Sequence, residues 1–146
     1  MLPGRAVLLD TLASRLPASG SAETPTVLLL VGLVRSASGW PISDDVLDEV
    51  TRRMASCLRG DDWLGISGPG EFAAVMVADV EGAESAATRV LASIAEAGIS
   101  DLACVAGVAQ LSPELSPSAL LRRGTLSLTV ARSIGGGQVI RYSGKH

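Results

Sequence analysis

Apolar residues recur along the chain first at helical spacing and then in strand-like runs. Residues 5–16 have apolar side chains at Ala6, Leu8, Leu9, Leu12 and Leu16, which predicts a helix that Pro17 ends. A linker of small residues, ASGSAET, follows. The next run, TVLLLVGLV at residues 26–34, is apolar throughout, so it predicts a central strand that is covered on both faces.

The middle of the chain predicts a helix followed by a hairpin. Ser43 is a good N-cap, and Asp44 and Asp45 in the first turn favour the helix dipole. The expected buried face of this helix consists of Val46, Leu47, Val50, Met54 and Leu58. Two strand-like pieces at 63–67 and 72–78 then meet across a Gly-Pro-Gly-Glu turn.

The second half predicts helices at 82–97 and from Ser116-Pro117, and strands at 102–111 and 138–142. In the first of these helices the residues expected to face inward are Ala83, Ala86, Val90, Leu91 and Ile94, and Gly98 ends the helix. The second helix contains the apolar residues Leu120, Leu121, Leu128 and Val130 and ends at 135–137. Gly124 inside the last helix weakens it by up to ~1 kcal/mol relative to Ala. This order predicts an α/β sandwich, a central mixed sheet of about five strands flanked by helices, in one domain over residues 1–146.

Composition narrows the class of protein. Hydrophobic residues make up 47% of the chain and aromatic residues 3%, so aliphatic side chains must fill the core. A net charge of −3 argues against a nucleic-acid partner or an anionic membrane surface. Cys57 and Cys104 have apolar neighbours and read as buried thiols. The apolar run is too short to span a bilayer and no secretory signal is visible, so we expect a soluble, cytoplasmic protein without membrane insertion.

Four segments in order resemble the GGDEF (diguanylate cyclase) family. LPGRAVLLDTL (2–12) resembles its opening helix, GPGEF (68–72) its signature hairpin, and VAGVA (105–109) its SIGIA strand. LLRRGTLSLTVARSIGGGQVIRY (120–142) resembles its closing LLRRADxALYxAKxxGxNxVxxY segment. The degenerate signature consists of Gly68, Pro69, Gly70, Glu71 and Phe72. The resemblance implies the cyclase-like fold and cyclic di-GMP as the theme of the chemistry, in a bacterial signal-transduction setting.

The catalytic acids that the resemblance implies are missing. Joining two GTP molecules requires metal ions, and hard divalent cations need carboxylate ligands. The family places acids where this chain has Val31, Leu33 and Gly70. Glu71 remains, but one carboxylate cannot rebuild a two-metal site, and Pro69 has no N–H to offer a phosphate. We therefore expect no cyclase activity, no catalytic residue, no bound metal and no cofactor.

Two positions match nucleotide-contacting residues of the family. Asp44 matches the acid that holds the guanine edge, and Arg132 falls where the family has a phosphate-binding lysine. The later arginine is replaced by Gly136, and the loop RSASGWPI is shorter than the family's guanine-pocket segment. Asp44 and Arg132 are therefore possible residual nucleotide contacts.

The resemblance also covers the family's inhibitory site for cyclic di-GMP. Arg59-Gly60-Asp61-Asp62 matches its R-x-x-D motif, and Arg89 matches the arginine of the following helix. Arginine holds phosphate or the guanine O6/N7 edge, and a carboxylate accepts the guanine N1–H and N2–H. The resemblance thus implies a disabled cyclase that senses the dinucleotide through Arg59, Asp62 and Arg89.

Other interpretations stay open. Arg59-Gly60-Asp61 also suits an ordinary helix C-terminus, and Arg89 a solvated helix residue. Family domains pair as dimers, so a homodimer or a protein-interaction module without a nucleotide ligand is the alternative function. Trp40 and Trp63 would serve as interface anchors if exposed, but we interpret both as core filling.

Overall fold

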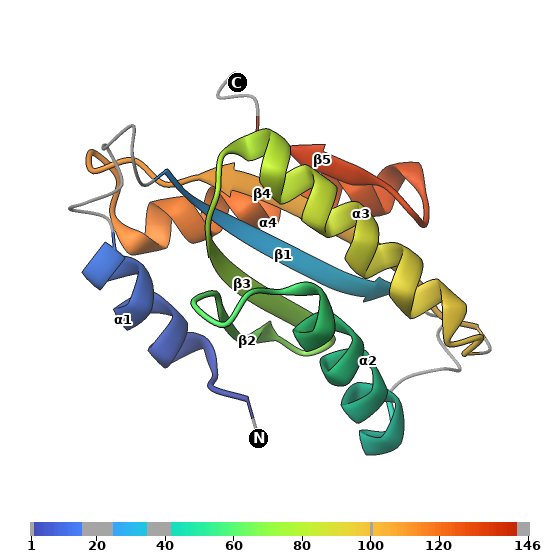
Figure 1. Ribbon diagram of the computed structural model, residues 1–146. Coiled ribbons are helices and arrows are strands. Elements are labelled where there is room, and N and C mark those ends of the chain that lie inside the picture. Colours follow the sequence, from blue (N-terminus) through green and yellow to red (C-terminus); the bar gives the residue numbers. More distant parts are fainter. Residues whose placement is uncertain (1, 16–24, 35–41, 100, 143–146) are drawn as a thin grey trace.

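The computed structural model describes residues 2–15, 25–34, 42–99 and 101–142. The nine elements are α1 (Arg5–Arg15), β1 (Thr26–Val34), α2 (Asp44–Cys57), β2 (Trp63–Gly68), β3 (Glu71–Val77), α3 (Val80–Glu96), β4 (Ala103–Gln110), α4 (Pro117–Ile134) and β5 (Val139–Arg141). They form one five-stranded sheet of order β2-β3-β1-β4-β5 with helices on both faces (Figure 1). The predicted fold class is therefore confirmed.

The predicted central strand lies at the centre of the sheet. β1 pairs antiparallel with β3 on one side and with β4 on the other, and β4 pairs parallel with β5. Every residue of β1 from Thr26 to Leu33 is buried. A continuous apolar run suits this place because neither face of the strand meets water.

Alternate residues of β1 pack in two different core layers. Val27, Leu29, Val31 and Leu33 pack with Val50 and Met54 of α2 and with α3, while Leu28 and Leu30 pack with Leu8 and Leu12 of α1 and with α4. Figure 1 shows α2 and α3 in front of the sheet and α4 behind it. The period of two in a strand thus assigns each apolar side chain to one layer.

Side-chain caps set the helix starts. The Ser43 and Ser116 hydroxyl oxygens accept the N–H groups of Val46 and Ala119, as the cap positions predict. α3 begins at Val80, two residues before its predicted start. The Asp79 carboxylate accepts the N–H of Gly82 at 2.7 Å, which caps the additional turn.

Gly124 has a packing role that its helix propensity does not show. A Cβ at Gly124 would lie 3.1 Å from Leu30 Cδ1, and a Cβ at Gly107 of β4 would lie 2.8 Å from the carbonyl oxygen of Gly124. The two glycines let α4 lie directly on the sheet. In the same helix Leu120, Leu121 and Leu128 are buried, but Val130 faces solvent.

Two segments with predictions lie outside the described residues: the linker 18–24 and residues 35–41, which include Trp40. Trp63 is half-buried against the α1/α4 layer, in line with core filling. Of the helices in the described ranges, none is long and apolar enough to cross a membrane.

Candidate functional site

The segment from Gly68 to Phe72, which resembles the GGDEF signature, includes the tight turn between β2 and β3. Pro69 and Gly70 are the two connecting residues, and Gly70 has a φ of 66°. Proline followed by a glycine of positive φ is typical of a type II turn. The Gly70 carbonyl accepts the N–H of Leu33 at 2.9 Å, so the turn is fixed to the end of β1.

The positions where the resemblance implies metal-binding acids lie in the core. Val31 is 0% exposed and Leu33 is 1% exposed, and both pack in the layer between the sheet and α2/α3. A carboxylate there would need a cation or hydrogen-bond donors to compensate for its burial. Across the described part of the chain, no three His, Cys, Asp or Glu side chains are grouped so that they could hold a metal ion.

Glu71 pairs with Arg132. Arg132 Nη1 lies 3.2 Å from Glu71 Oε2, and the Ser67 hydroxyl donates to Glu71 Oε1 at 3.3 Å. The guanidinium lies over Gly32, where a Cβ would be 2.6 Å from Arg132 Nη2. Arg132 therefore lies beside the β2–β3 hairpin, where a carboxylate of this chain already neutralises it.

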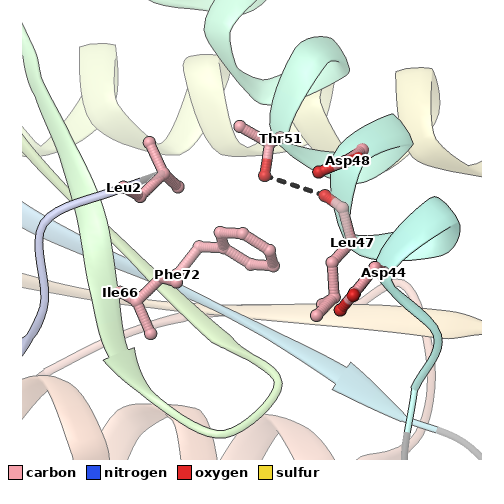
Figure 2. A pocket seen from close by; sticks show the side chains of 7 residues that line it. All are labelled: Leu2, Asp44, Leu47, Asp48, Thr51, Ile66 and Phe72. Atoms are coloured by element: carbon pink, nitrogen blue, oxygen red, sulfur yellow. Dashed lines mark hydrogen bonds between the residues drawn. The ribbon is translucent and has the colours of Figure 1, made fainter.

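An open cleft of about 600 Å³ lies between α2, the hairpin and the segment before α1 (Figure 2). Its described lining is Leu2, Asp44, Leu47, Asp48, Thr51, Ile66 and Phe72. Figure 2 shows the Phe72 ring projecting between Leu2 and the α2 residues, with Asp44 and Asp48 on the α2 side. The Thr51 hydroxyl donates to the Leu47 carbonyl at 2.8 Å.

The chemistry of this cleft is poorly suited to a nucleoside triphosphate. Its floor is apolar, its charged groups are the carboxylates of Asp44 and Asp48, and no basic side chain is among its described lining residues. A triphosphate needs cations or backbone N–H groups to offset its charge. Asp44 lines this cleft, whose described residues lack this complement.

Arg59 and Asp62 close a short turn between α2 and β2. The Asp62 carboxylate accepts the Arg59 N–H at 2.9 Å, and the Asp62 N–H donates to the Arg59 carbonyl at 3.1 Å. These two bonds position the Asp62 side chain and leave the Arg59 side chain exposed. The motif thus has a structural role as a turn, and its guanidinium is directed to solvent.

Arg89 lies on the exposed side of α3, which packs against α2. Within the described ranges neither Arg59 nor Arg89 forms an ion pair, whereas Arg52, Arg53, Arg132 and Arg141 each have a carboxylate partner. The three residues of the predicted binding site therefore come from adjoining elements on the α2/α3 side. The guanidinium groups of Arg59 and Arg89 are both available for an anion.

Sequence reasoning missed most of the cleft. Leu47 was predicted to be core, and Leu2, Asp48 and Thr51 had no predicted role. The available signal was the spacing of residues 44, 47, 48 and 51, which places them on one face of a helix. Leu2 gave no such signal, because a tertiary contact places the chain before α1 beside the hairpin: the Pro3 carbonyl accepts the Ile66 N–H at 2.8 Å.

No protein-family model and no curated protein matches this chain. Solved structures do. The active GGEEF domain of a diguanylate cyclase from Vibrio cholerae has a TM-score of 0.85 and 18% identity, and the comparison covers 99% of this chain and 100% of that one. The GGDEF domain of DgcB from Caulobacter crescentus, in complex with c-di-GMP, has a TM-score of 0.80 and 14% identity, with 97% and 91% covered.

A third similar structure is the diguanylate cyclase SiaD from Pseudomonas aeruginosa, in complex with its activator SiaC. Its TM-score is 0.83 and its identity 23% over 96% of this chain, and the chain spans only 58% of the length of SiaD. The architecture of β1, the β2–β3 hairpin and the flanking helices is shared along nearly the whole chain. This chain has the fold of the GGDEF domain.

Proposed function

We propose that this chain is a catalytically inactive GGDEF-like domain that binds cyclic di-GMP through Arg59, Asp62 and Arg89. The observation that carries the proposal is the turn from Arg59 to Asp62. Its two backbone-anchored hydrogen bonds hold the carboxylate in place, while the guanidinium remains exposed and unpaired within the described residues. The two parts of the proposal, loss of catalysis and retention of binding, rest on different residues.

The loss of catalysis follows from the missing carboxylates. Attack of a 3′-hydroxyl on an α-phosphate develops negative charge that metal ions neutralise, and these ions need oxygen ligands. Val31 and Leu33 offer aliphatic side chains buried in the core, and Gly70 offers none. The remaining acid, Glu71, is engaged by Arg132.

Ligand binding follows from the charges at the proposed site. Cyclic di-GMP presents phosphates and guanine edges, which an arginine fork recognises through paired N–H donors. The Asp62 carboxylate accepts the Arg59 N–H through Oδ2, which leaves Oδ1 for the guanine N1–H and N2–H groups. Arg89 adds a second guanidinium from α3. A domain of the same fold, DgcB, was solved with this ligand.

Calorimetric titration with cyclic di-GMP, with GTP in parallel, tests the proposal. We expect saturable binding of the cyclic dinucleotide and no Mg²⁺-dependent turnover of GTP. Arg59→Ala should abolish binding with little change in Tm, because the side chain is exposed. The matched control is Arg5→Ala, which removes an exposed arginine of α1 and should leave the affinity unchanged. Equal affinity in the Arg59 and Arg5 variants would refute the site.

A protein-interaction module is the second candidate function. It is supported by SiaD, a chain of the same fold that was solved in complex with its activator. An interaction module would co-purify with its partner whether or not nucleotide is present. A receptor would instead be stabilised by cyclic di-GMP, which raises Tm in proportion to the logarithm of ligand concentration above Kd.

A further inference from the structure

The outer face of α4 joins a basic residue to a row of exposed apolar side chains. Arg122, Leu126, Val130 and Ile134 follow one another at intervals of four residues, so they lie along one face of the helix. The three hydrophobic side chains are 49%, 48% and 57% exposed, and none of them belongs to either core layer. We call these four residues the α4 stripe. A rise of about 1.5 Å per residue makes the stripe about 18 Å long.

A hollow of about 360 Å³ lies beside the basic end of the α4 stripe. Its described lining is Leu115, Ala119, Arg122, Arg123, Leu126 and Tyr142. The Arg123 guanidinium lies 4.8 Å from the centre of the Tyr142 ring, and this contact holds the cation at the wall of the hollow. Across the described part of the chain, neither Arg122 nor Arg123 forms an ion pair. The hollow thus presents two positive charges that no described carboxylate neutralises.

The remainder of the α4 stripe has uncharged surroundings. Residues 124–131 contain no charged side chain. The Thr129 hydroxyl donates to the Thr125 carbonyl at 2.9 Å, and the Ser133 hydroxyl donates to the Val130 carbonyl at 2.7 Å. Because these hydroxyl hydrogens are satisfied inside the helix, an apolar surface can cover this face without leaving them unpaired.

We propose that the α4 stripe binds an amphipathic helix of a partner protein, one whose apolar face ends in a carboxylate. The carboxylate pairs with Arg122 and Arg123, and the apolar side chains of the partner cover Leu126, Val130 and Ile134. Charge complementarity selects this occupant. An apolar row alone would accept many surfaces, but two arginines at one end of it require an anion at that end of the partner.

The shape of the α4 stripe favours a helix over a small ligand. The side chains on one face of a helix form a convex row, which a small molecule touches on one side only. Rows of i±4 spacing fit into the grooves between the corresponding rows of a second helix, at a crossing angle of about −50°. A partner helix of about 12 residues is about 18 Å long and therefore spans the stripe.

Two other occupants match these charges less well. The α4 of a second copy of this chain has basic residues but no acid, so it would leave the arginines of the hollow without an anion. Anionic membranes are recognised by clusters of about four to eight basic residues. The hollow has only Arg122 and Arg123, and the chain as a whole carries a net charge of −3.

The α4 stripe is separate from the proposed site for cyclic di-GMP. α4 packs on the face of the sheet opposite α2 and α3 (Figure 1), whereas Arg59 and Arg89 lie on the α2/α3 side. Binding of a partner helix therefore does not depend on the nucleotide. Arg59→Ala should bind the partner helix as the unmodified chain does, so failure of one proposal leaves the other standing.

A charge-swap experiment with two synthetic peptides tests the proposal. The acidic probe is a helix of about 16 residues, long enough for the stripe, with two glutamates in its first turn followed by leucines at intervals of four. The basic probe has lysines in place of the glutamates, and all other positions are alanine or glutamine. Fluorescence anisotropy measures the binding of each probe to the full chain. We expect the acidic probe to bind at least about tenfold more tightly than the basic probe.

Substitutions in the α4 stripe should change these affinities in opposite directions. Arg122→Glu should weaken binding of the acidic probe about tenfold and strengthen binding of the basic probe, because the charge reversal turns attraction into repulsion. Val130→Glu should abolish binding of both, because it places a charge within the apolar contact. Arg5→Glu and Ala92→Glu are the matched controls. They make the same charge changes at exposed positions of α1 and α3 and should bind the acidic probe as the unmodified chain does.

The outcomes separate the possible occupants. Circular dichroism checks that each variant is folded, and Ile134→Glu replaces Val130→Glu if the latter is not. The proposal is overturned if the acidic probe does not bind at about 1 mM chain, if both probes bind equally, or if Arg122→Glu leaves the affinities unchanged. It is also overturned if Val130→Glu abolishes self-association of the chain or its sedimentation with phosphatidylglycerol vesicles. A second copy or a lipid surface would then be the occupant of the stripe.

Discussion

The guanidinium of Arg132 lies 3.2 Å from the carboxylate of Glu71, a residue 61 positions away in the chain. The contact joins α4 to the signature hairpin across the end of β1, where Gly32 leaves space for the arginine side chain. The side chains are 34% and 22% exposed, so water screens the pair only in part. Glu71, at the start of β3, is thus held by a cation of the same chain.

Restoring one acid should not restore catalysis. Gly70→Asp returns a carboxylate to the third signature position, but Val31 and Leu33 still provide no metal ligands. We expect no Mg²⁺-dependent product in a radiometric GTP-turnover assay. The control is an active GGDEF cyclase assayed in the same buffer. Product from the Gly70→Asp variant would mean that the metals find ligands elsewhere in the chain.

Alanine at Gly107 should destabilise the fold more than alanine at Gly32. The new Cβ at Gly107 would meet backbone, 2.6 Å from Leu128 N and 2.8 Å from Gly124 O. Moving a helix off a sheet costs about 1–3 kcal/mol or more. At Gly32 the closest atom is Arg132 Nη2, at the end of a flexible side chain that swings aside. Urea unfolding of both variants measures the difference, and equal losses would argue against close contact of α4 with β4.

Asp62 should contribute to both stability and binding, and two substitutions separate these roles. Asp62→Ala removes the acceptor of the Arg59 N–H and should lower the free energy of unfolding by about 1 kcal/mol, as for a lost cap. Asp62→Asn keeps an acceptor oxygen and should retain stability while it loses the carboxylate for guanine. Thermal melts and calorimetry on the same samples test this. Full cyclic di-GMP affinity in Asp62→Asn would contradict the proposed role.

Stability should fall at alkaline pH partly through Cys104. Burial raises the pKa of the Cys104 thiol from its ordinary 9.0 to about 12. Between these values the unfolded chain releases the proton while the folded chain keeps it, so the unfolded state is favoured as pH rises. We expect a loss of about 1 kcal/mol by pH 10 from this group. Below pH 8 the group has no effect.

Urea unfolding between pH 7 and about pH 10 measures this contribution. Cys104→Ala should show a shallower decline than the unmodified chain, even though its stability at neutral pH is lower. Cys57→Ala is the control because Cys57 is only half-buried. Identical pH slopes in the unmodified chain and in Cys104→Ala would mean that other groups account for the decline.

Local patterns determined the elements and their order. The apolar run at 26–34 predicts a strand buried on both faces, and Ser43 and Ser116 mark helix starts, because hydrogen bonding and burial over a few residues decide these features. Given the resemblance to the GGDEF family, the identities of residues 31, 33 and 70 also predict, without any coordinates, that metal ligands are missing. The Arg59-to-Asp62 motif was predictable for the same reason, since all its groups lie within four residues.

Only the tertiary structure decided which distant residues meet. The Glu71–Arg132 pair depends on β3 lying beside β1 and on α4 crossing the same strand. The cleft brings Leu2, α2 and Phe72 together from three parts of the chain. Apolar spacing marks both Leu128 and Val130 in α4, yet one is buried and the other exposed. A helix shows its apolar positions in sequence, but the face that becomes buried depends on the sheet against which it packs.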